Sequence, residues 1–140
     1  ADGASHPNRV VASGAISLAV SASKVSVGLP FVADAWTENI EAGAADGTAQ
    51  GKKKRISGLV LRLLRSLSIS FGPSADDLRD IDFRSTSDAM NAAPPLFTGD
   101  KVEDWPGGYE FDGRIFVRSD SSHPATLLSL FPTLETTSPR

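Results

Sequence analysis

The segment from Lys52 to Gly72, KKKRISGLVLRLLRSLSISFG, constrains the fold more than any other part of the chain. Large apolar residues occupy every second position over much of its length, and Arg65 is the one interruption. The apolar positions are Leu59, Leu61, Leu63, Leu67, Ile69 and Phe71. A period of two is typical of a β-strand that turns one face toward a core.

A helix is the alternative for the same segment, because other apolar residues in it fall near a 3.6-residue spacing. These residues are Ile56, Val60, Leu63, Leu64 and Leu67. Gly58 and the alternating serines near the end of the segment favour strands instead. We therefore predict two strands, Lys54–Leu64 and Leu67–Gly72, with Arg65 and Ser66 at a bend or bulge between them.

The rest of the chain is divided into short elements. Its 140 residues include 12 Gly and 9 Pro, which favours short strands joined by turns. We expect further β structure in a Val10–Leu18 hairpin that turns at Ser13-Gly14, and in Lys24–Gly28, Phe31–Trp36, Asp80–Arg84, Arg114–Arg118 and Ala125–Leu134. Ser74–Asp77 could form one helical turn, and Pro132 indicates an edge strand. Together these patterns predict an all-β fold, an antiparallel β-sandwich or barrel of short strands with little helix.

Pro30 suggests a division of the chain, because it holds both itself and Leu29 in extended geometry. We expect residues 1–30 to be the end of a small β-barrel module or a set of N-terminal strands, and residues 31–140 to form the main β-sandwich domain. Glu41–Lys54 contains three Gly and no large apolar residue, so it is expected to be a loop. The chain does not begin with Met, and we expect it to be a piece of a longer polypeptide.

Charge and composition exclude several classes of function. The formal net charge is -3, so any contact with nucleic acid would have to be local. The absence of cysteine excludes thiol catalysis, disulfides and thiolate metal sites. No apolar run approaches the ~18 residues that a membrane-spanning helix needs, so we expect no membrane span.

Two groups of residues could carry chemistry, and neither has the required pattern. His6 and His123 are each followed by proline, and no serine or aspartate spacing around them indicates a triad. The aspartates Asp76, Asp77, Asp80 and Asp82 could in principle chelate calcium. They lack the glycine and terminal glutamate of the twelve-residue calcium loop, and a solvated acidic loop paired with Arg79 and Arg84 is the preferred interpretation. We therefore expect no catalytic residue, no metal and no cofactor.

The basic run Lys52-Lys53-Lys54-Arg55 has two interpretations. It could be a solubilising strand entry that protects an edge, or it could contact phosphate or an acidic neighbouring subunit. The aromatic residues Trp36, Trp105, Tyr109, Phe111 and Phe116 could form a platform for sugars or bases. Core and interface anchors are the more usual role of such side chains.

Several separated blocks occur in an order that resembles one known family. They are GLPF (28–31), GKKKRI (51–56), APPLFTGD (93–100), WPGGYEFDGRIFV (105–117) and PATLLSLFPTLET (124–136). Together they are similar to the C-terminal region of the tail nozzle proteins of short-tailed bacteriophages, also called tail tubular protein B or packaged-DNA stabilisation protein. The residues before Phe31 resemble the end of the small β-barrel that precedes this region in the family.

The resemblance implies a structural virion protein without enzyme activity, made in the bacterial host cytoplasm and located in the phage tail. It implies a hexameric ring of copies below the portal and adaptor, with fibre or spike proteins as further neighbours. Double-stranded DNA would be held back by the ring and would later pass through its channel.

On this basis we expect subunit or DNA contacts in the Gly43–Arg55 loop and the Trp105–Phe111 turn. The candidate residues are Lys52, Lys53, Lys54, Arg55, Trp105 and Tyr109. The competing hypothesis is a β-sandwich binding module without catalysis, which would engage a carbohydrate or a host receptor through an exposed Trp36 or Trp105.

Overall fold

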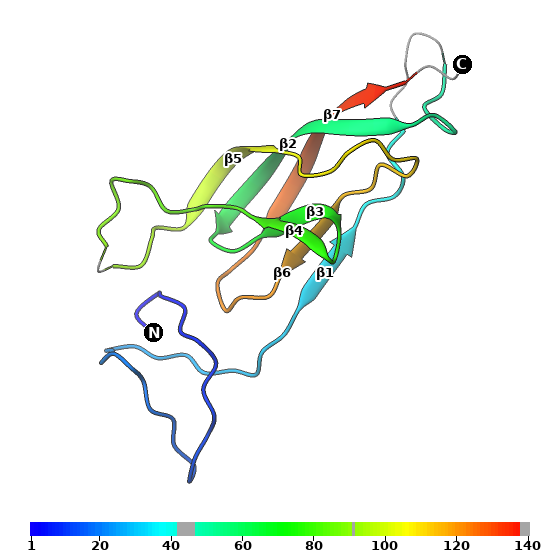
Figure 1. Cartoon of the computed structure of the whole chain (residues 1–140). Helices are drawn as coiled ribbons and strands as arrows, with labels where there is room; N and C mark the ends of the chain where they lie inside the picture. The colour runs from blue at the N-terminus through cyan, green and yellow to red at the C-terminus, as the bar shows by residue number, and fades with distance from the viewer. Residues whose placement is uncertain (42–46, 91, 138–140) are drawn as a thin grey trace.

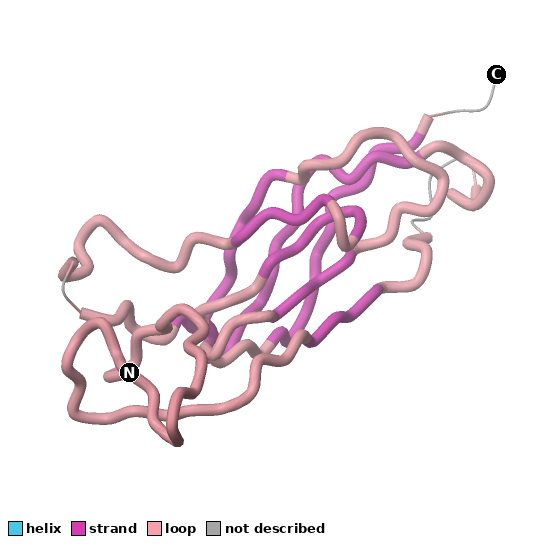
Figure 2. Tube along the Cα trace, turned by 60° about the horizontal axis from the view of Figure 1, so that its bottom comes forward, coloured by secondary structure: helices cyan, strands magenta, loops and turns pink. Residues whose placement is uncertain are grey.

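The computed structural model describes residues 1–41, 47–90 and 92–137 (Figure 1). These residues form seven strands and no helix, as the colouring of Figure 2 shows. The strands are β1 (Ala33–Trp36), β2 (Lys54–Ser66), β3 (Ser70–Ser74), β4 (Asp77–Asp80), β5 (Phe97–Asp104), β6 (Phe116–Ser119) and β7 (Leu127–Thr136). The prediction of an all-β fold of short strands is confirmed.

The strands make two antiparallel sheets that share one core. One sheet has the order β1-β6-β3-β4, and the other has the order β5-β2-β7. Leu59, Leu61 and Leu63 of β2 lie in the same buried cluster as Phe71 of β3 and Val117 of β6. The arrangement is therefore sandwich-like, with the central strand of the three-stranded sheet facing the middle of the other sheet.

The leucine-rich segment is the strand that the alternation predicts. β2 pairs with β5 on one side and with β7 on the other, and Leu59, Leu61 and Leu63 are almost completely buried. The expected bend is present as well: Arg65 has a φ of 49°, and the register with β5 shifts between Leu63 and Ser66. The prediction of strands rather than a helix is confirmed.

The N-terminal strand predictions are wrong. Ser13 and Gly14 form the expected tight turn, with φ values of 51° and 76°, but the turn carries a single bridge between Ala12 and Ala15. Lys24–Gly28 forms no strand, and neither does any other part of residues 1–32 as the structure describes them. Figure 1 shows this stretch running away from the sandwich, where no neighbouring strand pairs with it.

Two further predictions need correction. Ala75 and Asp76 form a tight turn between β3 and β4 instead of a helical turn, and this hairpin places β4 three residues before the predicted Asp80–Arg84 strand. The sequence did not predict β5, whose apolar residues are few. The remaining predictions, which correspond to β1, β6 and β7, are confirmed to within a few residues, and Pro132 does lie on an edge strand.

Candidate functional site

The basic run and the aromatic turn, which are far apart in sequence, meet at one end of the sandwich. The backbone N–H of Lys54 donates to the carbonyl of Glu110 at 2.7 Å, and the N–H of Glu110 donates back to the carbonyl of Lys54 at 2.8 Å. This bridge places the start of β2 beside the segment that contains Tyr109 and Phe111. Both predicted contact segments therefore contribute to one surface, although residues 42–46 of the predicted Gly43–Arg55 loop lie outside the described residues.

Three side chains of the basic run lie at or near this surface. Lys53 and Arg55 are exposed, and Lys52 is half-buried. The Lys53 Nζ lies 5.7 Å from the centroid of the Phe111 ring, within the range of a cation–π contact. Tyr109 and Phe111 are exposed beside them. We call Lys52, Lys53, Arg55, Tyr109 and Phe111 the basic-aromatic surface.

Two predicted contact residues lie inside the fold instead. Lys54 has only 2% of its surface exposed, and its ammonium donates to the carbonyl of Ile40 at 3.1 Å. Its side chain points inward because β2 turns the alternate residues Lys54 and Ile56 toward the interior. Trp105 is buried against Phe71, with the ring centroids 6.1 Å apart. Lys54 and Trp105 therefore lie beneath the surface and are not exposed on it.

The electrostatics of the surface include one perturbed carboxyl group. Partial burial, together with the neighbouring Asp112, raises the pKa of Glu110 above its ordinary value. The buried indole Nε1 of Trp105 has no hydrogen-bond partner among the described residues, and Gly107 packs against this atom. The Trp105–Phe111 turn therefore packs closely against the indole ring at Gly107.

The aspartates after β3 are not arranged as a metal site. Asp80 accepts a hydrogen bond from Ser70 Oγ at 2.6 Å, and Asp82 accepts one from the backbone N–H of Arg84 at 2.9 Å. The predicted pairing with Arg79 and Arg84 is wrong, because both guanidinium groups donate to backbone carbonyls. No three His, Asp or Glu residues in the described part of the chain are placed to hold a metal ion.

Both histidines lie in loops, as expected. The Nδ1 of His123 is 3.4 Å from Ser121 Oγ, and its Nε2 is buried without a hydrogen-bond partner among the described residues. His6 lies in the N-terminal stretch and lines a shallow groove with Pro30 and Ser122. The two residues do not share a site.

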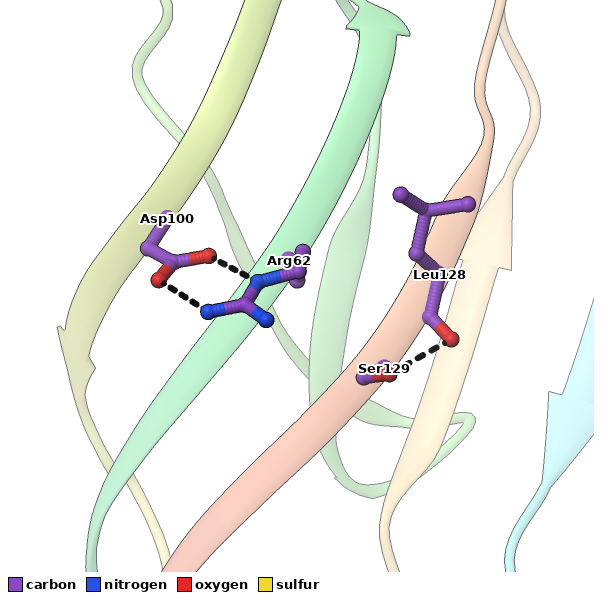
Figure 3. Close-up of polar contacts among 4 residues, drawn as sticks. All are labelled: Arg62, Asp100, Leu128 and Ser129. Carbon is purple, nitrogen blue, oxygen red and sulfur yellow. Dashed lines mark hydrogen bonds and ion pairs between the residues drawn. The ribbon is translucent and has the colours of Figure 1, made fainter.

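The sequence did not predict the charged rows on the outer faces of the two sheets. In one sheet, Asp34, Arg118, Ser70 and Asp80 lie in register across four strands. In the other, Asp100, Arg62 and Ser129 lie in register across three strands, and Figure 3 shows the two hydrogen bonds between Arg62 and Asp100.

Each arginine also stabilises its neighbours in the row. The bonds from Arg118 and Arg62 lower the pKa values of Asp34 and Asp100 respectively. Arg62 lies 5.1 Å from the ring centroid of Phe131, and Arg118 lies 5.3 Å from that of Phe116. Alternation along β2 places Arg62 on the outer face, but its partner could not be identified without a prediction of β5.

Trp36 is the exposed aromatic residue of β1. The residue is 57% exposed, and its ring packs edge-on against the buried Phe116, with centroids 4.6 Å apart. Phe116 is completely buried, on the same face of β6 as Arg118, and is not part of the cluster between the sheets.

Comparison with protein-family models gives no match for this chain, and comparison with curated proteins gives none. The described residues contain no helix long and apolar enough to cross a membrane.

Proposed function

We propose that the chain is a structural module of a bacteriophage tail, part of a nozzle ring of copies that retains the packaged genome and then lets it pass. The proposal begins with the resemblance of the five sequence blocks to tail nozzle proteins. One structural observation carries it further: the basic run and the aromatic turn form a single surface, held together by the two-way bridge between Lys54 and Glu110.

The chemistry of this surface suits an assembly contact. Tyrosine and arginine are enriched at the energetic centres of protein interfaces, because they combine large contact area with directed hydrogen bonds. Arg55, Tyr109 and Phe111 supply these groups on one surface. A ring forms when one such surface binds a different surface on the next copy and the rotation closes.

The same surface offers local positive charge to DNA. Lys53 and Arg55 are exposed on a chain whose net charge is -3, so binding would depend on this patch and on salt. Each phosphate contact lowers the logarithm of the affinity by ~0.9 per tenfold rise in salt.

Assembly is tested by light scattering on Arg55→Ala, Tyr109→Ala and the double variant. We expect the double variant to lose self-association, because it removes both anchors from the surface. Arg9→Ala, an exposed arginine in the N-terminal stretch, is the matched control and should assemble like the original chain. Unchanged assembly of the double variant would contradict the proposal.

DNA contact is tested separately by anisotropy of a labelled duplex over a salt series. Lys53→Glu with Arg55→Glu should reduce the affinity for DNA at low salt. The slope of log affinity against log salt should become shallower by the contribution of about two phosphate contacts. If the charge reversals leave DNA affinity unchanged, the surface does not bind phosphate.

The exposed Trp36 favours a second candidate, a carbohydrate or receptor-binding module. Aromatic rings stack on sugar faces when they are accessible, and Trp36 is accessible while Trp105 is not. Reproducible signal on a glycan array that is lost in Trp36→Ala would favour this function over a purely structural one.

A further inference from the structure

Within residues 1–41, 47–90 and 92–137, one of the two sheets has a strand fewer than the other. The sheet that contains β1 has four strands and the facing sheet has three, ending at β7. All four residues of β1 are exposed, including Ala33 and Ala35 on the core-facing side of the strand, where Ala35 pairs with the core residue Val117. Because both faces of this edge strand are exposed, no strand among the described residues lies opposite it in the facing layer.

An apolar groove marks the missing position. It has a volume of about 160 Å³, and Ala33, Ala35, Ile69, Val117 and Leu127 line much of it. Ile69 and Val117 belong to the buried core, so the groove opens directly into the interior of the sandwich. Filling it would remove apolar surface from water, which is favourable in proportion to the area covered.

β7 provides a pairing edge next to this groove. It pairs with β2 on one side, and no other strand among the described residues pairs with it. Pro132 lacks an N–H donor, so the part available for pairing is the stretch before it, 127–131. That stretch begins at Leu127, which lines the groove.

The chain itself contains a segment with the sequence pattern of the required strand, although it forms no strand in this structure. In Lys24–Phe31 every second residue is large and apolar, while the alternate residues are Lys24, Ser26, Gly28 and Pro30. The apolar residues are exposed: Val25 46%, Val27 70%, Leu29 91% and Phe31 61%. No hydrogen bond within the described part of the chain involves the backbone of residues 25–31. One apolar face and one polar face, with a proline near the end, suit a sandwich edge.

The segment cannot fill the groove of its own chain. Phe31 and Ala33 are two residues apart, which spans at most about 7 Å. Packed sheets lie about 10 Å apart, so a strand that ends at Phe31 cannot lie in the layer opposite β1 when β1 begins at Ala33. Figure 1 shows the segment outside the sandwich, leading into the start of β1.

We propose that Lys24–Phe31 of one copy adds to the free edge of β7 in a second copy and covers the core-facing side of β1 there. This inference rests on the proposed self-assembly and names a contact for it. The donor segment and the acceptor groove are different surfaces, so each copy can give one strand and receive one. When such a head-to-tail contact is repeated, the copies form a closed ring if the rotation from one copy to the next leads back to the first copy.

The test uses four variants of the full chain, with mass measured by light scattering over a concentration series. Val27→Asp disables the donor segment, and Val20→Asp is the matched control, because Val20 is similarly exposed in the same N-terminal stretch. Ala35→Lys disables the acceptor, since it places a charge in the apolar groove that the donor segment has to cover. Arg55→Ala with Tyr109→Ala reports separately on the basic-aromatic surface.

We expect Val27→Asp and Ala35→Lys each to be monomeric, Val20→Asp to assemble, and an equal mixture of the first two to form a one-to-one dimer. The mixture dimerises because one chain still donates and the other still accepts. A mixture that stays monomeric, or Val27→Asp that assembles normally, overturns the inference. If assembly is then lost only in the Arg55 and Tyr109 double variant, the proposed function survives without this contact.

A synthetic peptide with the sequence of Lys24–Phe31 decides the remaining case, in which the original chain is monomeric at all concentrations. Amide shifts along β1 and β7 on addition of the peptide would show that the groove accepts the strand. No shift would overturn the inference.

Discussion

Gly72 in β3 is a residue at which a single methyl group should be costly. A Cβ there would overlap the backbone carbonyl oxygen of Asp77 and lie 3.2 Å from the Leu78 Cα, across the β3–β4 hairpin. Backbone atoms cannot move aside as a flexible side chain can. We expect Gly72→Ala to lower the free energy of unfolding by about 1–3 kcal/mol, the usual cost of overpacking. Gly108→Ala is the control, since no atom of the described residues lies within 4 Å of its added Cβ, and it should be near neutral by urea denaturation.

The ionised Glu110 carboxylate should lower the free energy of unfolding at neutral pH. Burial and Asp112 raise its pKa in the folded state, so the fold favours the protonated carboxyl group and is less stable above that pKa than below the unfolded value. Glu110→Gln removes this ionisation. We expect the free energy of unfolding to rise by about 0.5 kcal/mol or less at pH 7, as for most partly exposed sites. This increase should vanish as the pH falls below the ordinary pKa of glutamate. Urea midpoints of both proteins at pH 7 and pH 4 measure it. An equal gain at both pH values would contradict the electrostatic cause.

At the scale of the strand, substitutions in β2 should cause large losses of stability on its buried face and small losses on its exposed face. Leu61 is completely buried between the sheets, whereas Leu64 is exposed on the outer face. Leu61→Ala removes buried methyl groups and leaves a cavity, so we expect a loss of about 2–5 kcal/mol. Leu64→Ala should cost much less. Equal costs in urea denaturation would mean that the two faces of β2 are not distinct in solution.

The ability to predict strands from this sequence depended on how much apolar surface each strand brings to the core. β2 could be predicted because Leu59, Leu61 and Leu63 all face one way. β5 could not, because FTGDKVED has two large apolar residues among four charges, and it becomes a strand through pairing with β2. Lys24–Gly28 has a good alternation and yet forms no strand, since alternation supplies a face but no neighbour to pair with.

The charged rows across the sheets should make stability depend on acid. Their arginines hold the pKa values of Asp34 and Asp100 below the ordinary 3.8. A lowered pKa contributes stability that is present above the unfolded value and is lost as the pH falls through the folded value. We expect Arg62→Gln with Arg118→Gln to lose less stability than the original chain when the pH is lowered from 6 to 2.5. Parallel urea midpoint curves for the two proteins would contradict this.

At the scale of the whole molecule, the candidate site was predictable as two segments but not as one surface. The sequence indicated the Gly43–Arg55 loop and the Trp105–Phe111 turn by charge and aromatic content. It could not show that Lys54 and Glu110 bridge them, because that contact joins residues far apart in the chain. The burial of Lys54 and Trp105 was equally hidden, since it depends on which face of each segment meets the core.

The distribution of the core also predicts which part of the chain folds independently. Every buried apolar residue in the described part of the chain lies between Ala49 and Val117, and none lies in residues 1–30. Deletion of residues 1–30 should therefore leave a single cooperative unfolding transition, with a free energy of unfolding within about 1 kcal/mol of the original, because surface stretches contribute little. The same deletion removes most of Lys24–Phe31, so the shortened chain should accept a strand but not donate one. Circular dichroism during urea denaturation checks the first expectation. Loss of the transition would show that the N-terminal stretch is part of the folding unit. We expect instead that the 31–140 chain folds stably and stays monomeric, because it keeps the sandwich and its open groove but has lost most of the donor segment.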